Sequence, residues 1–361
     1  MDVPAKAIAA VADHGGSLGR ARSLFPHVPQ PWIDLSTGIN PHSYPLFDLP
    51  ATALTRLPEV SSAGRLQAAA TVAYGAPSPL QVALAPGTQI LLPRVFSLVK
   101  PGRAVILGPT YAEHRRTASL CGHAAVEVRE FSALADADLA VVVNPNNPDG
   151  RVVSRADLLA LAETLRRRGG LLVVDEAFMD VGPREDSLCG DVGEGGIVVL
   201  RSFGKFFGLA GVRLGFAVAA PAIAERLDAE FGPWSVSGPA LEYGIRALAD
   251  LTWQDAMRKR LTSDAARLDA VLAAHGVIVD GGTSLFRHVT AADAAGLSDA
   301  LGHSGILVRN FADRPDELRF GLPGNEAEWQ RLRATLAAWG EGTAVGGGAV
   351  RAAPKAVGGS R

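Results

Sequence analysis

The stretch RSFGKFFGLAGVRLG, residues 201–215, places a single lysine, Lys205, among phenylalanines and glycines. Lysine usually keeps its ammonium group in water. One interpretation is therefore a surface lysine whose aliphatic stem covers apolar neighbours. The other is a buried amine whose pKa is lowered by desolvation and by the guanidinium group of Arg213, because such an amine is a good nucleophile toward a carbonyl carbon.

The lysine stretch follows the last of several short runs rich in valine, isoleucine and leucine. Helical patterns such as SRADLLALAETLRRR, residues 154–168, separate several of these runs. Short, almost uninterrupted apolar runs are typical of strands buried on both faces, so the sequence predicts an α/β fold with a mostly parallel sheet between helices. Ligands of such sheets bind at the carboxyl ends of the strands. The predicted strands are 103–108, 124–130, 139–145, 170–177 and 196–203.

Changes in residue composition and pattern along the chain predict four parts. The first is an N-terminal arm with a short helix, and the second is the large sheet domain. The third is a smaller α+β domain of amphipathic helices and short strands, and the last is a Gly/Ala-rich tail expected to be disordered. The predicted ranges are 1–30, 31–222, 223–340 and 341–361.

Composition limits the classes of function. The 361 residues, 48% of them hydrophobic, are enough for a substantial core. The 35 basic and 37 acidic residues nearly balance, so we expect neither a nucleic-acid nor a membrane partner. Cys121 and Cys189 lack the spacing of a disulfide framework or a metal site, and we expect no metal. Because no run of about 18 apolar residues occurs, the predicted location is the cytoplasm.

Three other features stand at predicted strand ends. Gly87, in APGTQ, precedes a helix whose first amides can hold a phosphate. Asn147 lies in the turn NPNNPDG, and Asp175 ends a strand that is apolar throughout. A buried carboxylate needs a partner, because an unpaired buried charge is costly. Taken singly, the three features are also explained as a helix start, an ordinary turn and a helix cap.

Taken together with the lysine, these features match the requirements of pyridoxal 5′-phosphate. We expect Lys205 to hold the cofactor covalently, Asp175 to keep its ring nitrogen protonated and Asn147 to bond its phenolic oxygen. The residues expected around the cofactor phosphate are Gly87, Thr88, Gln89, Ser202 and Arg213.

The order of these motifs resembles the aspartate aminotransferase superfamily, fold type I. The motifs are G-T at 87–88, N-P-x-G at 147–150, D-E-A at 175–177 and S-x-x-K-x-x-G-L-A-G-x-R-x-G at 202–215. The resemblance extends over roughly residues 10–340. It implies a seven-stranded sheet and a homodimer with sites at the subunit interface. It also implies that the ring of Tyr111 stacks on the cofactor.

Within the superfamily, the chain resembles two groups that act on small phosphorylated substrates, histidinol-phosphate aminotransferases and L-threonine-O-3-phosphate decarboxylases. The resemblance implies that Arg319 binds the substrate carboxylate, a task that suits the guanidinium fork, and that Arg309 contacts the substrate phosphate. The alternative for each arginine is a surface ion pair of little energetic value.

The decarboxylase group is favoured by two segments, HGGS at 14–17 and DLSTGINP at 34–41. They imply further substrate contacts from His14, Gly15 and Gly38, and the resemblance adds Asn147 to the substrate contacts. The chain departs from its relatives at Phe178, where aminotransferases carry a tyrosine that bonds the phenolic oxygen, and at Gly38, where some decarboxylases carry asparagine. It departs again at Leu57, where relatives carry a tyrosine that reaches the partner subunit's cofactor.

The favoured reaction is decarboxylation of O-phospho-L-threonine to (R)-1-aminopropan-2-yl phosphate, the linker of the cobalamin nucleotide loop. Histidinol-phosphate transamination and a non-catalytic ligand sensor of the same fold are the alternatives. The two reactions differ in which bond at Cα stands perpendicular to the cofactor ring, and sequence does not decide this. His114, His123 and the two cysteines are expected to have ordinary core or surface roles.

Overall fold

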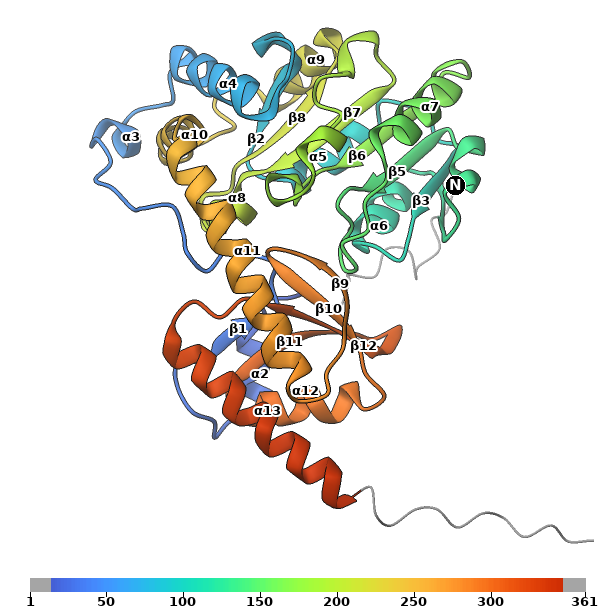
Figure 1. Cartoon of the computed structure of the whole chain (residues 1–361). Coiled ribbons are helices and arrows are strands. Elements are labelled where there is room, and N and C mark those ends of the chain that lie inside the picture. Colours follow the sequence, from blue (N-terminus) through green and yellow to red (C-terminus); the bar gives the residue numbers. More distant parts are fainter. Residues whose placement is uncertain (1–13, 347–361) are drawn as a thin grey trace, which may run out of the picture.

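The computed structural model describes residues 14–346 of the chain (Figure 1). A seven-stranded sheet has the order β2-β8-β7-β6-β5-β3-β4. Its neighbours are parallel, except that β8 runs antiparallel to both β2 and β7. The predicted large, mostly parallel sheet is therefore confirmed. The strands are β2 (Val82–Ala85), β3 (Arg103–Leu107), β4 (Ala124–Val128), β5 (Leu139–Val143), β6 (Leu171–Asp175), β7 (Ile197–Ser202) and β8 (Gly215–Ala219).

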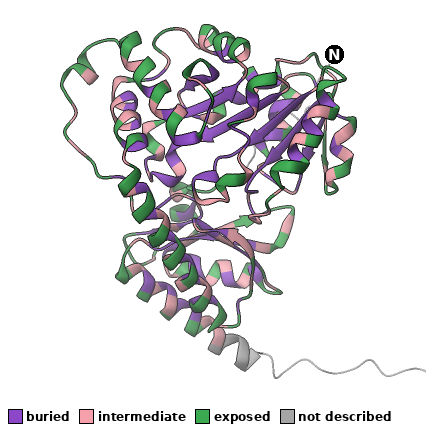
Figure 2. Ribbon diagram, turned by 45° about the horizontal axis from the view of Figure 1, so that its top comes forward, coloured by how far each residue is buried: buried purple, intermediate pink, exposed green. Residues whose placement is uncertain are grey.

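Helices cover both faces of this sheet, which explains why its central strands are largely apolar. In β6, Leu172 and Val174 pack into the core on one face, whereas Leu171 and Val173 pack into the core on the other. Figure 2 shows the central strands buried along their length. One face is covered by α4 (Val60–Tyr74), α7 (Arg155–Arg166) and α10 (Gly238–Ala249), the other by α5 (Thr88–Phe96), α6 (Glu113–Leu120) and α9 (Pro221–Phe231).

A second sheet of five strands has the order β1-β11-β12-β10-β9. Its first strand comes from the N-terminal segment and pairs in parallel with β11. The long helix α11 (Leu251–Ala273) runs from the large sheet down to this one (Figure 1). The other elements are β1 (Ile33–Leu35), β9 (Val279–Thr283), β10 (Phe286–Thr290), β11 (Ile306–Phe311), β12 (Arg314–Gly321), α12 (Ala294–His303) and α13 (Glu326–Gly346).

Short elements complete the chain. The predicted helix of the N-terminal arm is α2 (Leu18–Leu24). The other short α-helices are α3 (Thr52–Thr55) and α8 (Phe203–Phe206). The 3₁₀ turns are η1 (Pro79–Gln81), η2 (Phe131–Asp136), η3 (Met179–Val181), η4 (Arg184–Asp186), η5 (Val192–Glu194) and η6 (Ala210–Val212).

The observed elements bear on the predicted division of the chain. We keep the boundary near residue 222 as a proposal. β1 lies in the predicted large domain by sequence but joins the C-terminal sheet by pairing with β11. The disordered tail was predicted to begin at residue 341, but α13 extends to Gly346. Residues 1–13 of the predicted arm and 347–361 of the predicted tail lie outside the described residues.

A buried ionic cluster joins β7 to the segment that follows β6. The Arg201 guanidinium group lies 3.0 Å from Glu176 Oε2 and 2.7 Å from Asp180 Oδ1. It also lies 4.3 Å from the ring centre of Tyr74, on α4. Burial raises the pKa of Glu176, and the charge of Arg201 counteracts this effect. The cluster therefore holds the strand end from which Asp175 projects.

We expect Arg201→Met to destabilise the protein by about 3 kcal/mol, because Glu176 and Asp180 would be left as buried charges without their partner. The measurement is the midpoint of urea unfolding. Arg155→Met is the matched control, since the exposed pair of Arg155 with Asp191 is worth about 1 kcal/mol or less. Equal losses in the two variants would contradict the prediction.

Candidate active site

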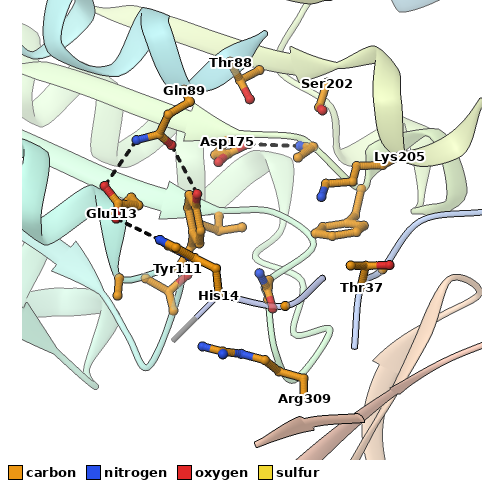
Figure 3. A pocket seen from close by; sticks show the side chains of 18 of the residues that line it. His14, Thr37, Thr88, Gln89, Tyr111, Glu113, Asp175, Ser202, Lys205 and Arg309 are labelled. Carbon is orange, nitrogen blue, oxygen red and sulfur yellow. Dashed lines mark hydrogen bonds and ion pairs between the residues drawn. The ribbon is translucent and has the colours of Figure 1, made fainter. Parts of the chain in front are cut away.

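A cavity of about 630 Å³ lies at the carboxyl ends of β5, β6 and β7, where the large sheet faces β11 and β12. Ligands of doubly wound sheets bind at this edge. All the site residues predicted from the sequence line the cavity, although they are far apart along the chain (Figure 3). They are His14, Gly15, Gly38, Gly87, Thr88, Gln89, Tyr111, Asn147, Asp175, Ser202, Lys205, Arg213, Arg309 and Arg319.

The start of α5 forms a cradle with the end of the lysine stretch. Gly87 has a φ of +92°, and a Cβ atom there would lie 2.6 Å from Nη2 of Arg213. A Cβ atom at Gly215 would lie 2.6 Å from the amide nitrogen of Thr88. Both positions exclude a side chain. The amides at the start of α5 and the guanidinium group of Arg213 therefore border a small open space beside Ser202. Such a space suits a phosphate ester.

Asp175 has the partner that its burial requires. Its Oδ2 lies 3.0 Å from Nε2 of His114, and its Oδ1 accepts a hydrogen bond from the backbone N–H of Ala177. His114 is fully buried and packs edge-on against the ring of Tyr111 at 5.6 Å. This contact with Asp175 differs from the ordinary role expected of His114 from the sequence. The available signal was its position one helical turn after Tyr111.

The other three residues given ordinary roles do not reach the cavity. His123 is a core residue hydrogen-bonded to the backbone of Phe96 and Gly102. Cys121 and Cys189 are free thiols. Within residues 14–346 we find no group of three acidic, histidine or cysteine side chains able to hold a metal ion.

Lys205 projects from α8 into the cavity and faces the ring of Phe178, whose centre is 6.0 Å from Nζ. Burial lowers the pKa of Lys205 from 10.5 to about 8, and the charges of Arg319 and Arg213 act in the same direction. The carboxylate of Asp175 opposes them. The observed environment is therefore that of the activated amine rather than that of a surface lysine.

Arg309 and Arg319 stand directly opposite each other on β11 and β12. Like charges in this arrangement are unfavourable unless an anion lies near them. Arg319 is 6% exposed, and its hydrogen-bond acceptors are the neutral oxygens Oδ1 of Asn147 and the carbonyl of Ser36. Burial and Arg309 lower the pKa of Arg319, and the charge of Asp34 opposes them. The pair is thus suited to a ligand with anionic groups.

One side of the cavity is formed by side chains hydrogen-bonded in series (Figure 3). The hydroxyl of Tyr111 donates to Gln89, whose amide donates to Glu113. Glu113 is 5% exposed and lies 3.2 Å from Nε2 of His14. Glu113, which was not among the residues predicted from the sequence, begins α6 and connects the N-terminal arm to the cavity wall.

Glycines allow the N-terminal segment to approach the cavity closely. A Cβ atom at Gly15 would lie 2.3 Å from the carbonyl oxygen of Ser36. A Cβ atom at Gly38 would lie 2.9 Å from both Phe178 and Phe286. A side chain at position 38 would require these rings to shift.

A family profile described as "Aminotransferase class I and II" matches residues 74–336. The chain belongs to this family. This aminotransferase-family protein is 43% identical over 327 residues to a threonine-phosphate decarboxylase of Pseudomonas aeruginosa, covering 90% of the chain and 97% of the relative. It is 40% identical over 326 residues to a threonine-phosphate decarboxylase of a Sinorhizobium species, with coverage of 90% and 97%.

The family fold is also found among solved structures. The histidinol-phosphate aminotransferase of Sinorhizobium meliloti, solved in complex with pyridoxal-5′-phosphate, matches this aminotransferase-family protein with a TM-score of 0.77. The match has 21% identity and covers 90% of this chain and 94% of that chain. This likeness confirms the predicted fold type I.

We expect Lys205→Met to stabilise the cofactor-free protein at pH 7 by about 1–3 kcal/mol, because the folded state disfavours the lysine charge. Wild-type Lys205 is protonated in both states below pH 8. Between about pH 8 and 10.5 the folded state loses this proton before the unfolded state does, so wild-type stability rises with pH there. The advantage of Lys205→Met should shrink across that window in urea unfolding.

The matched control for this experiment is Lys259→Met on the exposed face of α11. It should change stability by less than about 0.5 kcal/mol at each pH. A loss of stability in Lys205→Met at pH 7, or a gain that does not depend on pH, would show that the lysine charge is not disfavoured by folding.

Proposed function

We propose that this protein is a pyridoxal-phosphate-dependent decarboxylase that converts O-phospho-L-threonine into CO2 and (R)-1-aminopropan-2-yl phosphate, a step of cobalamin biosynthesis. The observation that carries the choice of reaction is the 43% identity to the Pseudomonas aeruginosa threonine-phosphate decarboxylase over 97% of that enzyme. The likeness to the Sinorhizobium meliloti aminotransferase, at 21% identity, concerns the fold. The cavity itself supports the substrate class.

A substrate with two anionic groups fits the arginine pair. The carboxylate of the substrate lies at Arg319, where the guanidinium fork offers paired donors. The phosphate lies at Arg309, on the neighbouring strand and directly opposite. His14, held by Glu113 at the cavity wall, offers a further polar side chain to the phosphate. Binding of these anions relieves the repulsion between the two arginines.

The other residues fit pyridoxal phosphate. The cradle of Gly87, Thr88 and Arg213 receives its phosphate ester, and Lys205 attaches it covalently through its aldehyde carbon. Asp175, oriented by His114, holds a proton on the ring nitrogen. The residues that complete this set are Gln89, Tyr111 as the stacking ring, Asn147 at the phenolic oxygen, and Ser202.

The reaction breaks the bond between Cα and the carboxylate carbon. Pyridoxal phosphate, when bound, supplies the electron sink for the pair left on Cα. Arg319 orients the carboxylate for departure as CO2. Lys205, whose Nζ faces the cavity, would then deliver a proton to Cα. Phe178 and Phe286 help to exclude water from this side.

The test is an assay of the purified holoprotein with O-phospho-L-threonine. We expect CO2 release in equal amounts with the amine phosphate, without any added 2-oxo acid. Lys205→Ala should abolish both CO2 release and the visible absorbance of the lysine-bound cofactor. Arg309→Gln should raise the KM for O-phospho-L-threonine by about 10-fold or more, because a charge-assisted contact is lost.

Arg333→Gln is the matched control for Arg309→Gln, since Arg333 lies on α13 and pairs with Glu326 at the surface. Turnover of histidinol phosphate that requires 2-oxoglutarate, with no CO2 from O-phospho-L-threonine, would identify an aminotransferase instead. Wild-type protein without cofactor absorbance, unchanged by Lys205→Ala, would identify a non-catalytic sensor.

We also propose that the protein is a homodimer in the cytoplasm. Large apolar side chains with more than half of their surface exposed gather on the segment around α3, which extends from the large sheet (Figure 1). They are Leu46, Leu54, Leu57 and Val60, with exposed fractions of 74, 72, 65 and 79%. Such a patch is typical of a protein interface.

In the described part of the chain, no helix is long and apolar enough to span a membrane.

We expect the double variant Leu54→Glu, Leu57→Glu to be monomeric, because the added charges would be buried at the interface. The measurement is light scattering coupled to size-exclusion chromatography of the holoprotein. Ile278→Glu is the matched control, because this side chain is 74% exposed beside β9 and outside the patch. A monomeric wild type, or a double variant that remains dimeric, would contradict the proposed interface.

A further inference from the structure

The helix that carries Lys205 is too short to hold its own shape. α8 spans Phe203–Phe206, a single turn, and a helix of this length has no stability of its own. The carbonyl groups at the end of a helix lack partners within the helix and must find donors elsewhere. The orientation of Lys205 therefore depends on groups outside α8.

One local donor is the backbone N–H of Gly208, 3.3 Å from the carbonyl of Lys205, and the others come from a distant segment of the chain, residues 40–44. The backbone N–H of Asn40 donates to the carbonyl of Lys205 at 3.0 Å, and its side-chain Nδ2 donates to the carbonyl of Phe206 at 2.8 Å. The backbone N–H of Tyr44 donates to the carbonyl of Phe207 at 2.8 Å. Three successive carbonyls of the lysine turn are thus capped from one segment.

The side chain of Asn40 is fixed in one orientation. It is 2% exposed, and its Oδ1 accepts the backbone N–H of His42 at 2.8 Å. A flipped amide would place oxygen against the carbonyl of Phe206 and nitrogen against the N–H of His42. Gly208, with a φ of +64°, allows the close approach, because a Cβ atom there would lie 2.6 Å from the carbonyl oxygen of Asn40.

The same segment reaches the substrate side of the cavity. Four residues before Asn40, the carbonyl of Ser36 accepts a hydrogen bond of 2.8 Å from Arg319. Between them lies Gly38, against the rings of Phe178 and Phe286. Residues 36–44 thus connect the arginine proposed for the substrate carboxylate with the turn that carries the lysine.

We propose that Asn40 is a positioning residue for Lys205: its amide caps α8 and sets the backbone from which the lysine reaches Cα. This proposal rests on the proposed function in taking Lys205 as the cofactor anchor and proton donor. Proton delivery requires the amine within hydrogen-bonding distance of Cα, and a misplacement of about 1 Å can cost about 100-fold in rate. A residue outside the reacting groups can therefore control turnover.

The test uses the holoenzyme of Asn40→Asp and Asn40→Ala. Aspartate keeps the shape and the acceptor for His42 but presents an oxygen to the carbonyl of Phe206, whereas alanine removes the cap altogether. For both variants we expect kcat to fall about 10-fold or more while KM stays within about twofold, because the arginines are untouched. We also expect weaker visible circular dichroism per bound cofactor, because the lysine holds the cofactor ring in the asymmetric environment of the protein.

His42→Ala is the matched control. It removes the contact of the His42 ring with Asp264, 2.8 Å away on α11, and leaves the backbone donors of the segment in place. Its kcat and circular dichroism should equal those of the wild type. Urea unfolding of each holoenzyme separates a lost cap from a loss of folded protein.

The proposal is overturned if both Asn40 variants keep wild-type kcat and circular dichroism, or if kcat falls only in proportion to folded protein. A rise in KM at unchanged kcat would also overturn it. If the wild type binds the cofactor but releases no CO2, the proposed function fails on its own. The circular dichroism of the Asn40 variants then still decides whether Asn40 positions the lysine.

Discussion

The ammonium group of Lys205 is partly buried in the cavity near two guanidinium groups, and the arrangement of the cavity depends on this constraint. Burial lowers the pKa of the lysine to about 8, and Arg319 and Arg213 add to the effect. Such a cluster of positive charge is unfavourable in an empty cavity and favourable around anions. The cradle beside Gly87 and the pair of facing arginines give two places where anions can lie, one on each side of the lysine.

The cost of this cluster is offset elsewhere in the fold. Strands β5, β6 and β7 are buried along nearly their whole length between two helical layers, so the strand ends that carry the site are rigid. The ion pairs of Arg201 with Glu176 and Asp180 fix the segment that follows Asp175. A stable framework of this kind supports a functional site whose own charges oppose folding.

Much of the fold and of the cavity was predictable because both follow local patterns. Apolar runs identified the central strands, and small polar motifs at their ends identified the cavity residues. β1 was missed because it is three residues long, and β8, GFAVA, was missed because it begins inside the glycine-rich lysine stretch. His114, Glu113 and Asn40 were missed for another reason: their roles depend on partners far away in the sequence, such as Phe206 for Asn40. The pairing of β1 with β11 was missed for the same reason, because the two strands are far apart in the sequence.

That pairing also sets the order in which the cavity can form during synthesis. The ribosome makes Ser36 and Gly38 early, directly after β1, yet the strand that holds β1 in its sheet is β11, Ile306–Phe311. The seven strands of the large sheet are complete by Ala219, so the cofactor side can assemble on a nascent chain. The side with Arg309 and Arg319 must wait until the last part of the chain has emerged, so an incomplete chain lacks the place proposed for the substrate carboxylate.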